Sequence, residues 1–210
     1  MIFIVNAENR SLFERDLIEM HRQRKQVFVD QAGWNVPVIG DMEIDSYDRD
    51  DTTYLIAKAA PDGAQVLASA RLLATTTPHL MSDLFADICR VPAPRGPATW
   101  EVSRFCVNSR LQSRRMRLGL LWETVCAVME TALLFGIEQI TYVANSALLP
   151  LTMDCGWEAQ ALGPTVPDGS DEVTALVAAI TPDALRSARR RFGIAGPVTR
   201  FPAPAARIAA

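Results

Sequence analysis

The residues best suited to chemistry lie in one short, otherwise apolar stretch, residues 99–108, which reads TWEVSRFCVN. Its β-branched and aromatic residues, and the proline-rich segment before it, predict a buried strand. Alternation along a strand divides its side chains between two faces, with Glu101, Ser103 and Phe105 on one and Val102, Arg104 and Cys106 on the other. A charge in such a strand is costly unless it is paired. Glu101 and Arg104 could therefore form a structural bridge, or the strand could be the floor of a reaction site.

An acidic loop containing a tryptophan comes earlier in the chain, at residues 30–51. Gly33, Pro37 and Gly40 interrupt any regular pattern there. The aspartates of the second half are Asp41, Asp45, Asp48, Asp50 and Asp51. The loop is longer than most connections in compact domains, which is typical of a lid or a binding loop. Trp34 could contact a ligand there or could be a plug in the core.

Residues 11–28 are predicted to form the helix before this loop. The apolar residues have helical spacing, and Ser11 with Glu14 matches a capping box. Arg24 and Phe28 are then one turn apart and can contact the same ligand or the same neighbour. A binding role and a purely structural role both remain open.

Basic residues follow the central strand. They are Arg110, Arg114, Arg115 and Arg117, and they lead into a helix predicted from about Leu118 to Phe135, which Gly136 ends. Such a block could meet an anionic ligand or partner, or could be a solvated helix start.

The remaining elements are predicted from local patterns. Strands at residues 53–59 and 65–73 form a hairpin around Pro61-Asp62-Gly63. Arg71 in the second strand needs a carboxylate partner, such as Asp45 or Asp48. The other elements expected are a short helix at 81–85, a strand at 139–144, a helix at 147–155, strands at 158–162 and 172–180, and a helix at 181–192 with Thr181 as its cap, followed after Gly193 by a loose tail.

Composition excludes several classes of protein. The 210 residues are 49% hydrophobic and 21% charged with a net charge of −3, which predicts one domain and gives no reason to expect nucleic acid. Four separated cysteines without a CxxC pair and two histidines predict no metal site. Free thiols favour a cytoplasmic location. No segment reaches membrane-spanning length, and residues 1–5 are expected to form a first strand rather than a signal peptide.

The order of elements resembles the N-acetyltransferase-like (GNAT) fold. This resemblance implies an α/β (α+β) single domain, a three-layer αβα sandwich around a mixed, mostly antiparallel sheet. In that fold the turn after the central strand holds the pyrophosphate of a pantetheine carrier. Arg114 and Gly119 fit the ends of the usual turn, but Arg117 replaces its first glycine. Arginine side chains would then replace part of the backbone contact.

A closer resemblance is to the acyl-homoserine-lactone synthases, the autoinducer synthase family. Nine residues stand in the order and approximate spacing of that family's signature: Arg24, Phe28, Trp34, Asp45, Asp48, Arg71, Phe85, Glu101 and Arg104. The text of residues 100–105 is also similar to the family's central motif. The match is dense in the first half of the chain, and in the second half it rests on element order and Gly156-Trp157. It implies a synthase domain at residues 1–192 and an Ala/Pro-rich tail at 193–210.

This resemblance implies that an acyl thioester joins the amino group of S-adenosylmethionine, after which the lactone closes and methylthioadenosine leaves, with no tightly bound cofactor. Trp34 and Phe28 would cover the sulfonium and the adenine. The implied partners of the other substrate groups are Asp45 and Asp48 for the cationic parts and Arg24 or Arg104 for the carboxylate, with Arg71 and Phe85 as orienting residues. Glu101 would be the general base or an anchor, and Ser103 would orient water or the acyl carbonyl.

The acyl donor is left more open. The acyl chain is expected between splayed strands, in a pocket formed by Phe105, Leu121, Val125, Met129, Val143, Leu148 and Met153, although any core would use such residues. The donor would be acyl carrier protein or coenzyme A, bound by the block Arg110 to Arg117. Ala144 or Asn145, where 3-oxo synthases tend to carry Thr, argues against a 3-oxo chain. The alternatives are another GNAT acyl-CoA N-acyltransferase and a catalytically silent binding regulator.

Overall fold

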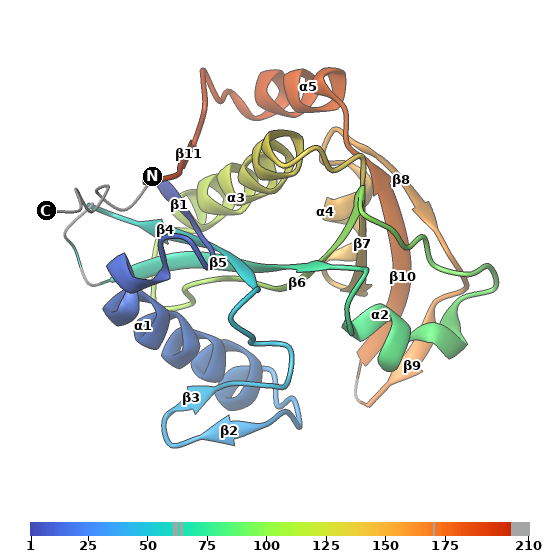
Figure 1. Cartoon of the computed structure of the whole chain (residues 1–210), viewed down its shortest axis with the longest axis horizontal. Helices are drawn as coiled ribbons and strands as arrows, with labels where there is room; N and C mark the ends of the chain where they lie inside the picture. The colour runs from blue at the N-terminus through green and yellow to red at the C-terminus, as the bar shows by residue number, and fades with distance from the viewer. Residues whose placement is uncertain (61–62, 64, 170, 203–210) are drawn as a thin grey trace, which may run out of the picture.

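The computed structural model describes residues 1–60, 63, 65–169 and 171–202. Within them, strands in the order β11-β1-β4-β5-β6-β7-β10-β8 form one mixed sheet, β9 pairs with β10, and helices cover both faces (Figure 1). This confirms the predicted three-layer α/β (α+β) sandwich. The elements are β1 (Ile2–Val5), η1 (Arg10–Leu12), α1 (Glu14–Arg24), η2 (Lys25–Gln31), β2 (Val38–Ile39), β3 (Met42–Glu43), β4 (Thr53–Lys58), β5 (Val66–Ala74), α2 (Leu80–Asp83), η3 (Ala86–Ile88), β6 (Thr99–Val107), α3 (Arg114–Leu134), β7 (Gln139–Asn145), α4 (Leu149–Met153), β8 (Glu158–Ala161), β9 (Val166–Asp168), β10 (Asp171–Ala179), α5 (Pro182–Phe192) and β11 (Thr199–Arg200).

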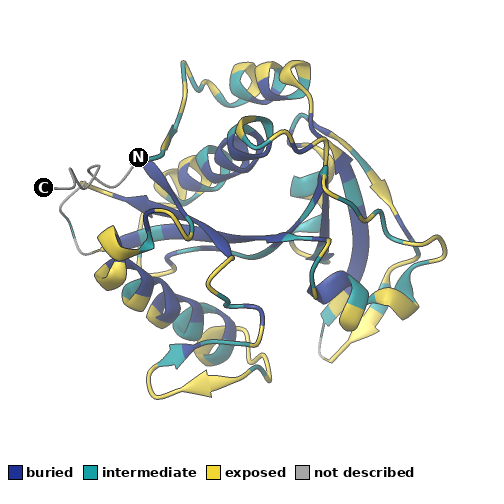
Figure 2. Cartoon of the chain, viewed as in Figure 1, coloured by how far each residue is buried: buried dark blue, intermediate teal, exposed yellow. Residues whose placement is uncertain are grey.

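The central strands are apolar on both faces because each face is covered by helices. Ile2 and Ile4 of β1 belong to the core beneath α3, whereas Phe3 and Val5 belong to a second core beneath α1. This alternation is the two-residue period of a strand. Buried residues accordingly concentrate in the sheet and on the helix faces that contact it (Figure 2).

The helix predicted at residues 11–28 is three segments. Ser11 lies in the short 3-10 turn η1, and α1 begins at Glu14 without a side-chain cap, so the expected capping box is not formed. After Arg24 the chain continues as a π-helix that carries Phe28. The wider turn of a π-helix changes the direction of every following side chain, and such segments are frequent at functional sites.

Other boundaries also differ from the predictions. The helix after β6 begins at Arg114, capped by Ser113, so three of the four basic residues lie in its first turn and Arg110 lies before it. The helix expected at 147–155 is shorter, and the acidic loop contains the hairpin β2–β3. The hairpin of β4 with β5 is confirmed, although Pro61 and Asp62 of its predicted turn lie outside the described residues. No helix in the described ranges is long and apolar enough to cross a membrane.

Strand β6 contains a bulge that the predicted alternation does not allow for. Ser69 and Arg71 of β5 are separated by one residue, whereas their partners Cys106 and Ser103 are separated by two. Arg104 lies in the bulge. Its φ is 50°, a left-handed conformation that is rare outside glycine. Side chains after Ser103 therefore change faces, so Cys106 lies beside Ser69 and Phe105 packs against the core under α3.

Residues 193–202, which were expected to belong to a loose tail, are held against the rest of the protein. Strand β11 pairs in parallel with β1, at the edge of the sheet. The carboxylate of Glu130 in α3 accepts hydrogen bonds from the backbone N–H groups of Val198 and Thr199, from the Thr199 hydroxyl, and from Arg189. One buried side chain thus fastens this segment. Residues 203–210 of the predicted tail lie outside the described residues.

Glu130→Gln is expected to lower the free energy of unfolding by about 2 kcal/mol, because one amide oxygen cannot satisfy all these donors. Urea unfolding measures this loss. Glu138→Gln, at an exposed position just beyond the same helix, is the control and should change stability little. Equal effects of the two variants would contradict the anchoring role of Glu130.

Candidate active site

Three arginines and three carboxylates form a closed ring of alternating charge on the α1 face of the sheet. In order, its ion pairs are Arg24–Glu43 (2.5 Å), Glu43–Arg104 (3.0 Å), Arg104–Asp45 (2.8 Å), Asp45–Arg71 (2.5 Å), Arg71–Asp48 (3.1 Å) and Asp48–Arg24 (2.7 Å). The members come from α1, β3, β5, β6 and the loop before β4. Their formal charges cancel, which allows the group to be buried.

Burial and pairing act in opposite directions on this ring. Burial alone would raise the pKa of Asp48, but the hydrogen bonds and charges of Arg24 and Arg71 hold it well below its usual range. Burial alone would lower the pKa of Arg24, but Asp48 and Glu43 hold it above its ordinary value. The Tyr54 hydroxyl also donates to Asp48, at 2.8 Å. Both groups of the Arg24–Asp48 pair therefore stay charged.

The ring approaches the surface at Arg104 and Asp45. Their side chains are each 7% exposed, whereas the other four members are exposed by 1% or less. Phe28 and Trp34 stack there with 4.7 Å between ring centroids, and Trp34 is 39% exposed. The Arg104 guanidinium lies 5.7 Å from the first ring centroid and 5.9 Å from the second. This aromatic pair therefore already accepts a cation on its face.

Glu101 does not pair with Arg104, so the structural bridge considered for them is not formed. Glu101 as a residue is 2% exposed, and its carboxylate accepts hydrogen bonds from the backbone N–H groups of Leu80 at 3.1 Å and Met81 at 2.5 Å, at the start of α2. Burial raises the pKa of Glu101 to about 7, although those two N–H groups and Arg71 act to lower it. A carboxylate with this pKa can exchange a proton near neutral pH.

Hydroxyl groups lie on either side of Glu101. Ser103 is two residues further along β6, and its Oγ accepts a hydrogen bond from Arg71 Nε at 3.0 Å, which leaves its own proton free to donate. Thr141 of β7 pairs in register with Glu101, and its hydroxyl is buried without a partner among the described residues. These groups could orient a water molecule or a carbonyl oxygen beside the carboxylate.

Most of the predicted site residues come together. Arg24, Asp45, Asp48, Arg71 and Arg104 belong to the ring. Arg71 was expected to pair with Asp45 or Asp48, and it pairs with both. Phe28 and Trp34 lie over Arg104, and Phe85 packs beside α2. Sequence reasoning missed Glu43. Its two-residue spacing before Asp45 was the available signal, because it places both carboxylates on one side of an extended segment.

The predicted acyl-pocket residues are divided by the sheet. Val125 and Met129 lie in the core under α3, with Phe105, Leu121 and Leu148 packed against it. Val143 is on the other face, in the cluster of Met81 and Leu162, because alternate residues of β7 face opposite sides. Met153 is 47% exposed. On the α3 side, Tyr142 and Trp157 take the places that were expected for Val143 and Met153, with their ring centroids 5.7 Å apart.

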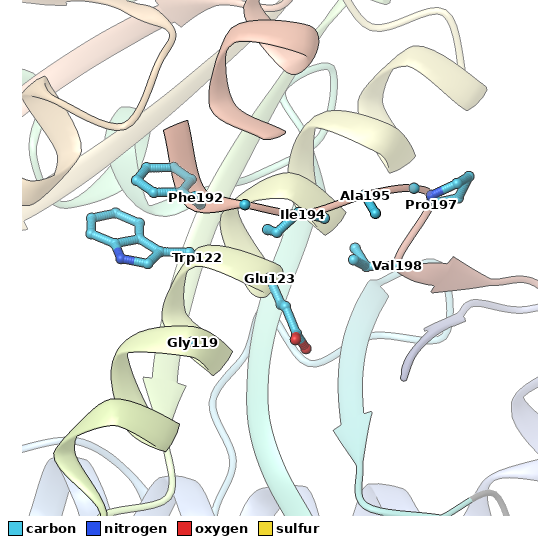
Figure 3. A pocket seen from close by; sticks show the side chains of 10 residues that line it. Gly119, Trp122, Glu123, Phe192, Ile194, Ala195, Pro197 and Val198 are labelled. Atoms are coloured by element: carbon cyan, nitrogen blue, oxygen red, sulfur yellow. The ribbon is translucent and has the colours of Figure 1, made fainter. Parts of the chain in front are cut away.

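The basic block also divides. Arg110, Arg114 and Arg115 are exposed, but Arg117 donates to the carbonyl oxygens of Leu111 and Gln112. Arg117 therefore stabilises the turn in which it lies, at the position where the GNAT pattern has glycine. A cavity of about 370 Å³ lies between Trp122 of α3 and residues 192–198 (Figure 3), and none of the ring residues lines it. Among the described residues there is no group of three potential ligands that could hold a metal ion.

Glu43→Gln is expected to lower the free energy of unfolding by about 3–5 kcal/mol, because it leaves two buried arginines without a shared counter-charge. Asp41→Asn in the same hairpin is the matched control. It removes only an exposed pair with Arg22 and should cost below about 1 kcal/mol. Denaturant unfolding of both variants measures these free energies. A loss of stability in Glu43→Gln as small as that in Asp41→Asn would show that the ring does not act as a unit.

Known proteins match this chain over most of its length. The family described as Autoinducer synthase matches residues 8–188. An acyl-homoserine-lactone synthase of Pseudomonas aeruginosa is 31% identical over 82% of this chain and 87% of its own length. The isovaleryl-homoserine lactone synthase of Bradyrhizobium diazoefficiens is 35% identical over 78% of this chain and 72% of its own length.

Solved structures agree with the sequence relatives. A CoA-dependent acyl-homoserine lactone synthase, BjaI, in complex with SAM and isopentyl-CoA, superposes with a TM-score of 0.87 at 30% identity, covering 98% of this chain and 94% of that one. A putative N-acetyltransferase from Lactobacillus plantarum, at 15% identity and a TM-score of 0.58, shares the fold alone. Neither a general N-acyltransferase nor a silent regulator is favoured by these matches. The chain is an enzyme and belongs to the autoinducer synthases, the family of acyl-homoserine-lactone synthases.

Proposed function

We propose that this enzyme makes an N-acyl-L-homoserine lactone from S-adenosylmethionine and an acyl-CoA thioester, releasing methylthioadenosine. The observation that carries the proposal is the arrangement of one strand, β6. Its Arg104 meets an aromatic pair and acids suited to a sulfonium compound, while Glu101 and Ser103 of the same strand face the same side. A cation site and a proton acceptor thus lie within a few residues of each other.

S-Adenosylmethionine would bind at the exposed part of the ring. Phe28 and Trp34 offer π faces to the sulfonium and the adenine, and Asp45 offers a carboxylate to the cationic groups. Arg104 is the residue for the substrate carboxylate. Arg24, the other candidate, is 1% exposed and its guanidinium is held by Glu43 and Asp48, so we assign Arg24 and Asp48 to the support of the site.

The acylation step needs a base and a polarised carbonyl. Glu101 removes a proton from the substrate ammonium, directly or through water, and the free amine attacks the thioester carbon. The carbon–sulfur bond of the thioester breaks and the thiol leaves with a proton. Ser103 is placed to donate to the carbonyl oxygen, because Arg71 already fills an acceptor position of its hydroxyl.

Lactone closure needs mainly a folded substrate. The carboxylate oxygen of the acylated methionyl group attacks the carbon bonded to the sulfonium, and that carbon–sulfur bond breaks as methylthioadenosine leaves. No oxidant or further reactant is required. Positioning therefore supplies most of the acceleration in this step.

The donor would enter between two strands. Strands β6 and β7 pair only from Thr99–Gln139 to Glu101–Thr141 and then diverge, as their directions in Figure 1 show. An acyl chain placed between them on the α3 side would meet Tyr142 and Trp157, whose bulk would restrict its length. This supports a short or branched acyl group, as does similarity to an isovaleryl-homoserine lactone synthase. Arg110, Arg114 and Arg115 remain available for the carrier's phosphates.

The state of the cysteines bears on the compartment in which the enzyme works. All four cysteines are free, which is typical of a reducing compartment. We infer that the enzyme works in the cytoplasm.

Trp34→Ala is expected to weaken S-adenosylmethionine binding about 2- to 30-fold, because one face of the cation site is lost. Titration calorimetry measures the change. Trp122→Ala is the matched control, since Trp122 stacks on Phe192 on the opposite face of the sheet. An equal loss of S-adenosylmethionine affinity in both variants would show that Phe28 and Trp34 do not form part of the substrate site.

Glu101→Gln is expected to lower kcat/KM by about 100-fold or more, measured as methylthioadenosine release with isopentyl-CoA and other donors. In the unmodified enzyme kcat/KM should rise with pH through about 7, where Glu101 ionises. Full turnover by Glu101→Gln would show that Glu101 is not the general base and only anchors the substrate or a neighbouring residue.

The same variant tests the pKa through stability. A carboxyl group whose pKa is raised on folding contributes stability below its unfolded value of 4.5, and this contribution is lost as the pH rises through about 7. The unmodified enzyme should therefore lose stability relative to Glu101→Gln over that interval, by at most about 3 kcal/mol. Parallel stability curves would contradict the raised pKa.

A further inference from the structure

Tyr47 is the residue of the acidic loop whose side chain reaches the helix that holds Glu101. Its hydroxyl donates to Asp83 Oδ2 at 3.1 Å, and its ring packs with Leu73 and Leu80. The other side of the ring faces Arg71, whose guanidinium carbon lies 5.7 Å from the ring centroid. Tyr47 therefore contacts both the ion-pair ring and α2.

Helix α2 holds the Glu101 carboxylate and is only four residues long. The two hydrogen bonds that Glu101 accepts come from Leu80 and Met81, the first two residues of α2. Asp83 is the last residue of the same helix. So short a helix has little stability of its own and depends on side-chain contacts for its position. Among the described contacts, the bond from Tyr47 fixes the end opposite to Glu101.

We propose that Tyr47 is a positioning residue for Glu101, because its hydroxyl fixes, through Asp83, the helix whose backbone N–H groups orient that carboxylate. The acidic loop thus has two tasks. Asp45 and Asp48 complete the ring, and Tyr47, between them in the sequence, transmits the position of the loop to α2. The inference rests on the proposed function for its effect on catalysis, but the link between Tyr47 and α2 can be measured without substrate.

Tyr47→Phe isolates the hydroxyl, because the ring and its contacts with Leu80 and Arg71 remain. Tyr54→Phe is a matched control that also removes a tyrosine hydroxyl bonded to an aspartate of the loop, Asp48, at 2.8 Å. The hydrogen bond that this control removes supports the ion-pair ring and does not involve α2. Circular dichroism should show both variants folded.

Hydrogen exchange gives the direct test. The Leu80 and Met81 amides should exchange about fivefold faster in Tyr47→Phe and at an unchanged rate in Tyr54→Phe, since about 1 kcal/mol of support is removed in the first variant alone. Asp83→Ala should reproduce the faster exchange from the other side of the bond. Unchanged exchange in Tyr47→Phe, or equal changes in both tyrosine variants, would overturn the inference whatever the enzyme's substrates are.

The pH dependence of kcat/KM gives the catalytic test. The charged or titratable groups that face Glu101 are Arg71 on β5, Asp83 on α2 and Tyr47 itself, while β7 presents the neutral Thr141. Weaker N–H bonds stabilise the carboxylate less, so the acidic limb should move up by about half a pH unit in Tyr47→Phe, with kcat reduced. Tyr54→Phe should leave the limb in place and raise KM for S-adenosylmethionine. An unmoved limb in Tyr47→Phe, or a flat profile in the unmodified enzyme, would contradict positioning of Glu101 through α2.

Discussion

The closed ring of three arginines and three carboxylates is the interaction on which the site depends. Each member contacts two opposite charges, so removing one leaves two buried groups short of a partner. The ring also joins elements far apart in sequence, because α1, the hairpin of β3, β5 and β6 each contribute to it. A loop of this length would otherwise have few contacts to order it, and here its acids bind to arginines fixed on a sheet and a helix.

The ring also determines where a charged substrate can act. It is electrically neutral as it stands, so in the proposed function a cation that enters beside Asp45 would take over contacts now made by Arg104. The guanidinium of Arg104 would then be available to a carboxylate of the same ligand. Its strained backbone, with φ at 50°, holds the side chain on this face. Local strain of about 1 kcal/mol is small beside the ion pairs that this conformation permits.

Sequence patterns predicted what depends on local chemistry and missed what depends on register. Arg71 required a carboxylate, and a loop rich in aspartate was at hand, so its pairing could be foreseen. Phe105 was expected on the face of Glu101 and Ser103 because alternation assumes a continuous strand, but the bulge in β6 turns it to the α3 side. Val143 of β7 lies on the opposite side of the sheet, so it is separated from Phe105 in the expected acyl pocket. The segment after Gly193 was expected to be a loose tail, whereas Glu130 on α3 accepts hydrogen bonds from the backbone N–H groups of Val198 and Thr199. Contacts between distant segments leave no periodic signal.

Strand β6 is where the two halves of the proposed reaction would meet. Its bulge turns Ser103 and Arg104 to the same side, although they are neighbours in the sequence. Its separation from β7 begins directly after Glu101, so a thioester passing between the strands would arrive beside this carboxylate, whose pKa burial raises to about 7. In the proposed function the amine donor would be held by Phe28, Trp34 and Asp45 together with Arg104 of this strand, and the acyl chain would be received on the α3 side.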